Sequence, residues 1–239
     1  VPGALPHEVV KAKVVRSEPR HIEAELISIE KRSPNRSVPV CPVYEQCGGC
    51  QLQHTDVAGQ LAGKMEIIRE SFARYAGIHK PPIRPIAGMA DPWWYRHKAS
   101  LQAGTIRGRT VLGLYSPASR KLVDIAGCPV QQQDINKAAD AIRGLIEELG
   151  IPPYREKSKE GLLRTVVLRK SSHSGELQVT FVLAEDRLPK AIQKKLIEGI
   201  TAKLPEVATI AVNIQRKNTP LVFGEQTRVL WGKPDIEER

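Results

Sequence analysis

Residues 162–184, LLRTVVLRKSSHSGELQVTFVLA, hold two runs rich in β-branched and large apolar side chains. Both runs, LLRTVVLRKS and ELQVTFVLA, alternate apolar and polar positions, and HSG between them is typical of a turn. The stretch therefore predicts two neighbouring antiparallel strands. We expect them to belong to a mostly antiparallel sheet.

Further strands and two helices are predicted on either side of this hairpin. The residues of the helix over 134–149 that share one face are Ile135, Ala138, Ile142, Leu145 and Leu149, and Gly150 follows as a stop signal. A second helix is expected to start at Pro189, a favoured first-turn residue. The further expected strands are 96–104, 110–115, 121–125, 207–215, TPLVFG at 219–224 and TRVLWG at 227–232.

The amino-terminal part carries a second strand pattern and one more helix. In residues 7–31, apolar and polar side chains alternate in two runs separated by the turn SEPR. This pattern predicts a β-hairpin and part of a small β-barrel. A helix is expected over 56–76, with Thr55 capping its start and Gly77 ending it. Its apolar stripe, which we expect to pack in a core, is Val57, Leu61, Met65, Ile68 and Phe72. The whole chain is therefore expected to be α+β.

The charge of the chain points to a polyanionic partner. The formal net charge is +10, and the pI is about 9.6. This balance favours RNA or DNA as a partner, although a protein can also be basic without binding either. No apolar run approaches the roughly 20 residues needed to span a bilayer. No signal peptide is visible either, so we expect a cytoplasmic protein without a membrane partner.

The ends of the sequence predict that it is a piece of a longer protein. The chain starts without a methionine, and the first strands of the expected barrel would precede Val1. Its polar end, GKPDIEER, resembles a linker more than the end of a finished domain.

Three of the four cysteines lie close together in CPVYEQCGGCQLQH, residues 41–54. The spacing is C-x5-C-x2-C, and Cys128 follows Cys50 after 77 residues, directly before a proline. A close triplet with a remote Cys-Pro is common among [4Fe–4S] clusters held by four thiolates. Gly48 and Gly49 would let the backbone curve around a cluster and donate N–H groups to its sulfides.

Other interpretations of the cysteines stay open at this point. Structural zinc is the main alternative, although zinc sites usually carry two close cysteine pairs. C-x2-C could also be a redox pair, but it does not lie at the strand-to-helix turn of a thioredoxin-like unit. Four unrelated buried cysteines are a third possibility. Disulfides are not expected, because nothing marks the chain as secreted.

The cysteine stretch and the helix after it, DVAGQLAGKMEIIRE, resemble the bacterial RNA (uracil-5-)-methyltransferase family, in particular its 23S ribosomal RNA branch. The resemblance covers nearly the whole chain, and His97 stands where the family more often has asparagine. The matching segments are VPGALPHEVVKAKV for the TRAM barrel, WWYRHKASLQAG for the WxYRNK strand, GLYSPASRKLVDIAGCPVQ for the segment with the fourth cluster cysteine, and TPLVFGEQTRVLWG for the last strands before the catalytic domain.

The resemblance implies a cofactor and a division of the chain. It implies a [4Fe–4S] cluster that holds the central domain together, with four ligands: Cys41, Cys47, Cys50 and Cys128. It implies a partial TRAM (OB-like) barrel over 1–37, an iron–sulfur and RNA-binding domain over 38–232, and a linker over 233–239. A cross-link between residues 41 and 128 would close a loop of about 87 residues, which restricts the unfolded chain strongly.

The resemblance also implies the reaction of the intact protein. Family members bind S-adenosylmethionine in a carboxy-terminal domain, where a cysteine attacks carbon 6 of uracil and carbon 5 accepts the methyl group. This sequence has no glycine-rich strand-to-helix turn and no fifth cysteine. We therefore expect no catalytic residue in this chain, no activity of the chain alone, and a monomer whose partner is 23S ribosomal RNA.

Basic residues between Trp93 and Gly127 are the candidates for RNA contact. They are Arg96, Lys98, Arg107, Arg109, Arg120 and Lys121. A second group is Lys157, Lys159, Arg164, Arg169 and Lys170. Basic groups at alternating strand positions can follow phosphates, although a single lysine more often lies on a solvated face. The aromatic residues 93–95 could stack on unpaired bases, but at least one is expected in the core.

Two other functions are compatible with these features. A stand-alone, non-catalytic RNA-binding module with structural zinc or a cluster would share the basic faces. An electron-transfer iron–sulfur protein is disfavoured by the +10 charge and by the few apolar residues that flank the cysteines.

Overall fold

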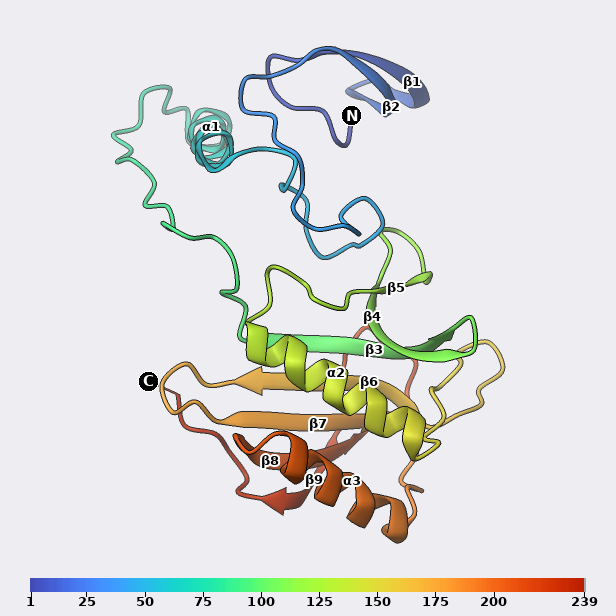
Figure 1. Ribbon diagram of the computed structural model, residues 1–239. Helices are drawn as coiled ribbons and strands as arrows, with labels where there is room; N and C mark the ends of the chain where they lie inside the picture. Colours follow the sequence, from blue (N-terminus) through green and yellow to red (C-terminus); the bar gives the residue numbers. More distant parts are fainter. Residues whose placement is uncertain (239) are drawn as a thin grey trace. The chain divides into compact units, whose positions relative to one another are not determined.

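The computed structural model describes residues 1–238, which fall into two compact units (Figure 1). The first unit comprises Val1–Tyr44 and Cys50–Asp91, and the second comprises Glu45–Gly49 and the chain from Pro92 onward. The expected divisions after residues 37 and 232 stay predictions. No helix in residues 1–238 has the length and apolar character needed to cross a membrane.

The first unit contains the predicted hairpin. β1 (Val9–Glu18) pairs with β2 (His21–Lys31) in an antiparallel two-stranded sheet, and Glu18 lies opposite His21 across a two-residue turn. The alternation of residues 7–31 is thus confirmed as a hairpin. The wider TRAM barrel stays a prediction.

A buried ion pair closes the base of this hairpin. Arg36 donates from Nε to Glu8 Oε1 at 2.5 Å and from a terminal nitrogen to Glu8 Oε2 at 2.7 Å. The backbone N–H groups of Leu5 and Ser33 also donate to this carboxylate, at 2.8 and 3.2 Å. The Glu8 side chain is fully buried. The hydrogen bond from Arg36 lowers the pKa of Glu8 more than burial raises it, so that the pKa is about 2.

The helix of the first unit, α1 (Val57–Ala76), differs from expectation at its start and along its stripe. Asp56 is the N-cap, because its carboxylate accepts the Gly59 N–H at 2.7 Å. The predicted cap Thr55 instead donates to Asn35 O at 3.2 Å. Gly77 ends the helix with a φ of 66°, as predicted.

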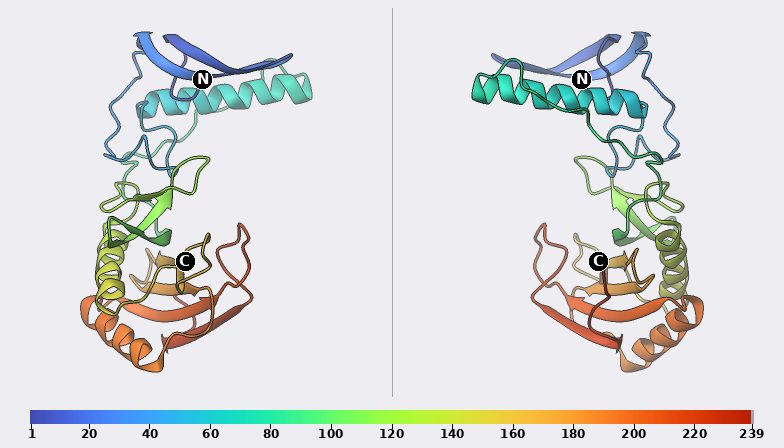
Figure 2. Two further views of the ribbon diagram at one scale, coloured as in Figure 1. Left: turned by 90° about the vertical axis from the view of Figure 1, so that its right-hand side faces the viewer. Right: turned by 90° about the vertical axis from the view of Figure 1, so that its left-hand side faces the viewer.

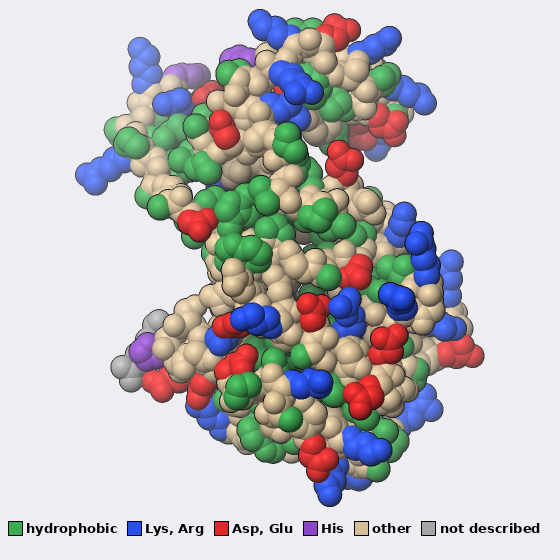
Figure 3. Space-filling model, viewed as in Figure 1, with side chains coloured by type: hydrophobic (Ala, Val, Ile, Leu, Met, Phe, Trp, Pro, Cys, Tyr) green, Lys and Arg blue, Asp and Glu red, His purple; other side chains and the backbone are tan. Residues whose placement is uncertain are grey.

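The apolar stripe of α1 is not a core, which corrects the expectation. No residue of α1 is buried, and 41% of the surface of Phe72 stays exposed. A two-stranded sheet offers too little apolar surface to cover a helix of this length. Hydrophobic side chains therefore lie open among charged ones on the first unit (Figure 3).

The second unit is built on one seven-stranded sheet with the order β5-β4-β3-β6-β7-β8-β9. Its strands are β3 Lys98–Ile106, β4 Arg109–Tyr115, β5 Leu122–Asp124, β6 Leu163–Lys170, β7 Leu177–Leu183, β8 Val207–Ile214 and β9 Gln226–Gly232. Only the pair β7–β8 is parallel, and α3 (Lys190–Lys203) connects these two strands. The predicted α+β class with a mostly antiparallel sheet is confirmed.

One predicted strand is wrong. TPLVFG at 219–224 forms a loop, because buried amide side chains of the neighbouring strand bind its backbone. Asn213 donates to Gly224 O at 3.0 Å and accepts the Gly224 N–H at 2.7 Å. These bonds replace those that a strand ladder would make.

Both helices of the second unit cover the same face of the sheet, and the loops around residues 157 and 220 rise on the other side (Figures 1 and 2). α2 (Gln133–Glu148) buries Ile135, Ala138, Ile142 and Leu145, which confirms its predicted apolar face. It packs near Leu101 of β3. A row of paired side chains continues this core: Leu101, Val166, Phe181 and Val212, each at most 1% exposed.

The next row of the ladder points to the opposite side, because side chains alternate along strands. It consists of Gln102, Thr165, Val182 and Asn213. We call this side of the sheet the polar face. It also carries Lys98 and Arg169, which lie opposite each other on β3 and β6.

We expect Ile142→Ala to destabilise the second unit by about 2–5 kcal/mol, because Ile142 is fully buried on the apolar face of α2. Denaturant unfolding followed by tryptophan fluorescence measures this loss, since all three tryptophans belong to this unit. Ile197→Ala on α3 is the control. Its loss should be at most about half as large, because Ile197 is only half-buried. Equal losses would contradict this description of the core.

The hairpin of the first unit should lose stability in acid through Glu8. Its folded pKa of about 2 lies below the ordinary 4.5, so its contribution is present above pH 4.5 and disappears as pH falls toward 2. Hydrogen exchange of the β1 and β2 amides, corrected for intrinsic rates, should show this loss. Glu8→Gln should remove that pH dependence, whereas Glu225→Gln, at an exposed ion pair, should leave it unchanged.

Candidate functional site

All four cysteines are half-buried. Cys41 and Cys50 belong to the first unit, and Cys47 and Cys128 belong to the second. Within residues 1–238, no three His, Cys, Asp or Glu side chains are grouped so that they could hold a metal ion. The four-cysteine ligand set therefore stays a prediction, and each cysteine is described by its own surroundings.

The two glycines before Cys50 are explained by a close approach to β4. The Gly48 N–H donates to Tyr115 O at 3.2 Å, and a Cβ on Gly48 would lie 2.8 Å from that oxygen. The Gly49 N–H points to Cys47 Sγ at 3.4 Å. Neither glycine has a positive φ, so closeness and not backbone curvature requires glycine at position 48.

Cys41 has an unusual neighbour in Gln53. The Cys41 N–H donates to Gln53 Oε1 at 3.1 Å, which fixes the amide beside the cysteine. Gln53 Nε2 is buried and has no hydrogen-bond partner in the described chain. A buried amide without an acceptor is costly, and a sulfur ligand is one acceptor that would satisfy it.

Tyr44 and His54 support the same segment. The Tyr44 hydroxyl and His54 Nδ1 are 2.6 Å apart. Burial lowers the pKa of His54, and the nearby Arg36 lowers it further. Burial also raises the pKa of Tyr44. Both side chains are therefore held neutral near pH 7.

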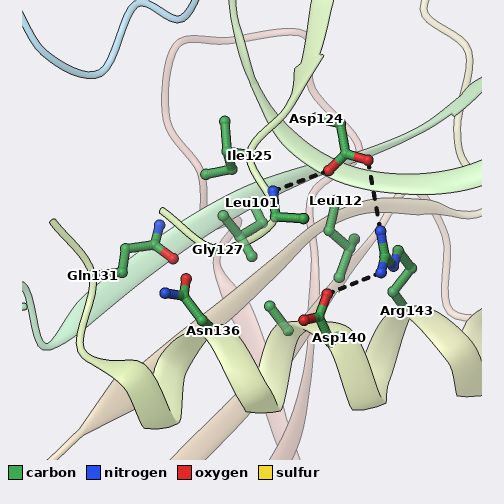
Figure 4. Close-up of a pocket in the computed structure, with 11 residues that line it drawn as sticks. Leu101, Leu112, Asp124, Ile125, Gly127, Gln131, Asn136, Asp140 and Arg143 are labelled. Carbon is green, nitrogen blue, oxygen red and sulfur yellow. Dashed lines mark hydrogen bonds and ion pairs between the residues drawn. The ribbon is translucent and has the colours of Figure 1, made fainter. Parts of the chain in front are cut away.

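Cys128 lies on a loop that α2 holds in place. Asn136 Nδ2 donates to Cys128 O at 2.9 Å. About two turns further along α2, Arg143 pairs with Asp140 at 2.9 Å and with Asp124 of β5 at 3.6 Å (Figure 4). The cavity between these groups has a volume of only about 10 Å³. It is too small for a substrate, and the hydrogen bond from Asn136 is what ties the Cys128 loop to α2.

The segment after Cys128 is joined to the WYR motif by main-chain hydrogen bonds. Trp94 N–H donates to Pro129 O, and Arg96 N–H donates to Val130 O, both at 2.9 Å. Trp94 is one of the few non-glycine residues with a positive φ, at 54°. The backbone of Arg96 is therefore fixed by the same loop that carries Cys128.

The six predicted RNA contacts do not form one patch. Arg96 and Lys98 lie at the start of β3, whereas Arg107 and Arg109 flank the turn at its other end. The two ends of this nine-residue strand are about 26 Å apart. The remaining two candidates, Arg120 and Lys121, lie in the exposed connection between β4 and β5.

Charge is distributed differently over the two sides of the second unit. On the helix-covered side, Lys and Arg alternate with Asp and Glu, and basic side chains gather only at the edge over β4 and β5 (Figure 3). On the polar face, Lys98 and Arg169 lie opposite each other without an ion pair within residues 1–238. Like charges opposite each other are unfavourable, which suggests that they serve an anionic ligand.

Other basic residues have internal partners. Lys170 is only 13% exposed and pairs with Asp134 at 3.1 Å, which lowers the pKa of Asp134. Arg164 pairs with Glu156. Lys170 is therefore structural and Arg164 is held by Glu156 at one terminal nitrogen, while Arg169 stays available. No sequence pattern points to Gln53 or Asn136, because their contacts with Cys41 and Cys128 are created by the fold.

Comparisons with known proteins were made for the whole chain. No family model matches it. An uncharacterised RNA methyltransferase of Halalkalibacterium halodurans is 42% identical over 240 residues, which cover 100% of this chain and 51% of that protein. An uncharacterised RNA methyltransferase of Listeria monocytogenes is 41% identical over 242 residues, which cover 100% of this chain and 52% of that protein.

A solved structure is also similar, the Pyrococcus abyssi tRNA (uracil-54, C5)-methyltransferase in complex with S-adenosyl-L-homocysteine. The TM-score is 0.65 at 26% identity, covering 96% of this chain and 49% of that one. The chain thus spans about half the length of the curated relatives it matches. Homologues that match it from end to end are named RNA methyltransferases, and its structural neighbour is of the uracil-C5 type.

Proposed function

We propose that this chain is the RNA-recognition and [4Fe–4S] portion of an S-adenosylmethionine-dependent 23S ribosomal RNA (uracil-5-)-methyltransferase, which makes 5-methyluridine as a monomer. The observation that carries the proposal is the match with named RNA methyltransferases over 100% of this chain. The similarity to a uracil-C5 enzyme bound to S-adenosyl-L-homocysteine supports the cofactor and the reaction class.

Within this proposal, methyl transfer belongs to the half of the relatives that the chain does not match. The attack on uracil carbon 6 needs a free cysteine. All four cysteines here are proposed ligands of a cluster. The contribution of this chain is then to bind and orient the RNA, which supplies affinity and positioning but no bond-making step.

Cys41, Cys47, Cys50 and Cys128 are the proposed ligands of the cluster. Two observations fit a sulfur-rich group beside them. Gln53 keeps a buried N–H donor without an acceptor next to Cys41, and the Gly49 N–H is directed at Cys47 Sγ. When bound, the cluster would supply a covalent cross-link between distant parts of the chain.

Transfer RNA is the second candidate substrate, because the structural neighbour is named for it. We favour 23S ribosomal RNA because the cysteine spacing resembles that branch of the family. A stand-alone RNA-binding module with a structural metal is the other alternative. It would bind RNA in the same way without a methyltransferase partner domain.

The cluster is tested by the visible absorption of the chain, by its iron and sulfide content, and by a substitution of Gln53. Anaerobically purified chain should show broad visible absorption that bleaches on reduction, with iron and acid-labile sulfide in equal amounts. Cys50→Ser should lose most of the iron. Gln53→Glu keeps the acceptor for the Cys41 N–H but replaces the N–H donor by an anion, so cluster loss in air should become faster.

Gln226→Glu, at the exposed start of β9, is the control and should keep the cluster lifetime unchanged. A colourless chain with one tightly bound zinc would disprove the cluster. A Cys50→Ser chain with normal iron content would disprove this ligand set.

RNA binding is tested by its salt dependence. The chain should bind 23S ribosomal RNA hairpins more tightly than transfer RNA, without binding S-adenosylmethionine. Lys98→Gln and Arg169→Gln should each weaken binding to all sequences and reduce the salt slope by about one. Lys194→Gln on the helix-covered side should change neither. An unchanged slope in both polar-face variants would place the RNA elsewhere, and tighter transfer RNA binding would favour the second substrate.

A further inference from the structure

The polar face of the second unit contains a pocket, and Arg120 is the one predicted RNA contact among its lining residues. Its volume is about 300 Å³, which reaches the lower limit of small-molecule sites. Its floor is formed by Gln102 and Thr165 of the sheet, and its walls by the segment 154–164 and the loop 215–222. These two segments rise on the side of the sheet opposite α2 and α3 (Figure 2).

Buried amides give the pocket a rigid wall. Gln215 donates to Leu221 O at 3.3 Å and to Phe223 O at 3.0 Å, and Asn213 binds Gly224 in both directions. A Cβ on Gly224 would lie only 2.0 Å from Ile214 O, so the loop approaches β8 as closely as glycine allows. The wall is therefore formed before any ligand binds.

The other wall presents a buried guanidinium. Arg164 is 12% exposed and lies 4.0 Å from the centre of the Tyr154 ring, while Glu156 accepts from one terminal nitrogen. Arg164 Nε is buried and has no partner within residues 1–238. A buried donor without an acceptor needs an explanation, and a ligand oxygen or ring nitrogen supplies one.

The floor adds a second donor. The Thr165 hydroxyl donates to Gln102 Oε1 at 3.2 Å, which fixes the orientation of the Gln102 amide. The two N–H donors on Gln102 Nε2 make no hydrogen bond in the described chain. Gln102 and Arg164 therefore offer donors for an edge that carries acceptors, as nucleobases do.

The rim has the chemistry of a nucleotide site. Tyr115 is 40% exposed, and Arg120 and Lys217 are exposed cations that line the same pocket, where Lys217 also pairs with the exposed Glu225 at 3.0 Å. With Arg164 the lining carries three cations against one carboxylate, Glu156. An aromatic ring together with cations suits a stacked base with its phosphate.

The pocket also lies in line with the unpaired charges of the polar face. Gln102 is four residues from Lys98 along β3, and Thr165 is four residues from Arg169 along β6. The two sites are therefore about 13 Å apart on the same face of the sheet. A strand of RNA whose phosphates contact Lys98 and Arg169 could place a neighbouring nucleotide in the pocket.

We propose that this pocket binds one unpaired nucleotide of the RNA, with the base edge hydrogen-bonded to Gln102 and Arg164 and the phosphate near Arg120 and Lys217. This inference rests on the proposed function, because it assumes that RNA lies on the polar face. It adds a site that reads a base outside the reaction centre.

The test is a thermodynamic cycle between base and pocket, using this chain and a 23S ribosomal RNA hairpin. Each unpaired nucleotide is replaced in turn by an abasic one, which removes the base and keeps the phosphate. At one position the abasic change should weaken binding about tenfold. With Gln102→Leu, the intact RNA should bind about tenfold more weakly, and the abasic change at that position should have no further effect.

Arg164→Lys is the second variant, because it keeps the charge beside Glu156 and loses the planar donors. Arg164→Lys should also remove the difference in affinity between intact and abasic RNA, with a melting temperature near that of the unchanged chain. Gln178→Leu is the matched control, because Gln178 is half-buried on the same face and does not line the pocket. It should keep the full tenfold difference.

The outcomes separate this inference from the proposed function. If RNA binds but no abasic position matters, or if both pocket variants still discriminate, the pocket is not a base site and the proposed function stands. If the chain binds no RNA, the proposed function fails and this inference fails with it. If free AMP binds the pocket as tightly as the hairpin does, the ligand is a free nucleotide and the RNA assignment is overturned.

Discussion

The antiparallel pairing of β3 with β6 determines which side chains of the second unit form its core and which meet a ligand (Figure 1). In this register Leu101 lies opposite Val166 under α2, and the next pair, Gln102 and Thr165, points to the other side. A slip by one residue would exchange the two sides, with polar groups in the core and apolar groups on the surface. Every functional statement about the polar face depends on this register.

The same pairing carries an unfavourable interaction that the core offsets. Lys98 and Arg169 repel each other at the end of the ladder, whereas the rows beneath α2 are almost fully buried. Surface repulsion is weak beside apolar burial, so the sheet tolerates it. An anionic ligand bound between Lys98 and Arg169 would remove this repulsion. Lys170, the next residue, shows the contrast, because it is neutralised by Asp134.

Periodicity in the sequence predicted what depends on local pattern and burial. The hairpin at 7–31, α2 and the central strands were all found, because alternation and helical spacing reflect a single buried side. The predictions that were wrong involve distant partners. TPLVFG has strand composition but is bound by amides of β8, and the stripe of α1 is not covered within its own unit. Thr55 and Asp56 are both good N-caps, and only the contact with Asn35 decides between them.

The features of the candidate site likewise fall into those that a sequence pattern can predict and those that depend on distant partners. Cysteine spacing and basic composition can be recognised in a sequence, because ligand type and charge are properties of residues. The donors without acceptors, on Gln53, Gln102 and Arg164, cannot, because a missing partner is a property of the fold.

The loop of Cys128 joins these two kinds of feature. Asn136 fixes its carbonyl from α2, and the following residues bind the backbone of Trp94 and Arg96, directly before β3. A displacement of Cys128 must therefore move the start of β3, because the hydrogen bonds that join them are short and main-chain. Lys98 is the first residue of that strand. The Cys128 loop and the basic residues of the polar face are thus connected through the main-chain hydrogen bonds at the start of β3. A group bound at Cys128 would therefore stabilise the surface that we propose binds RNA.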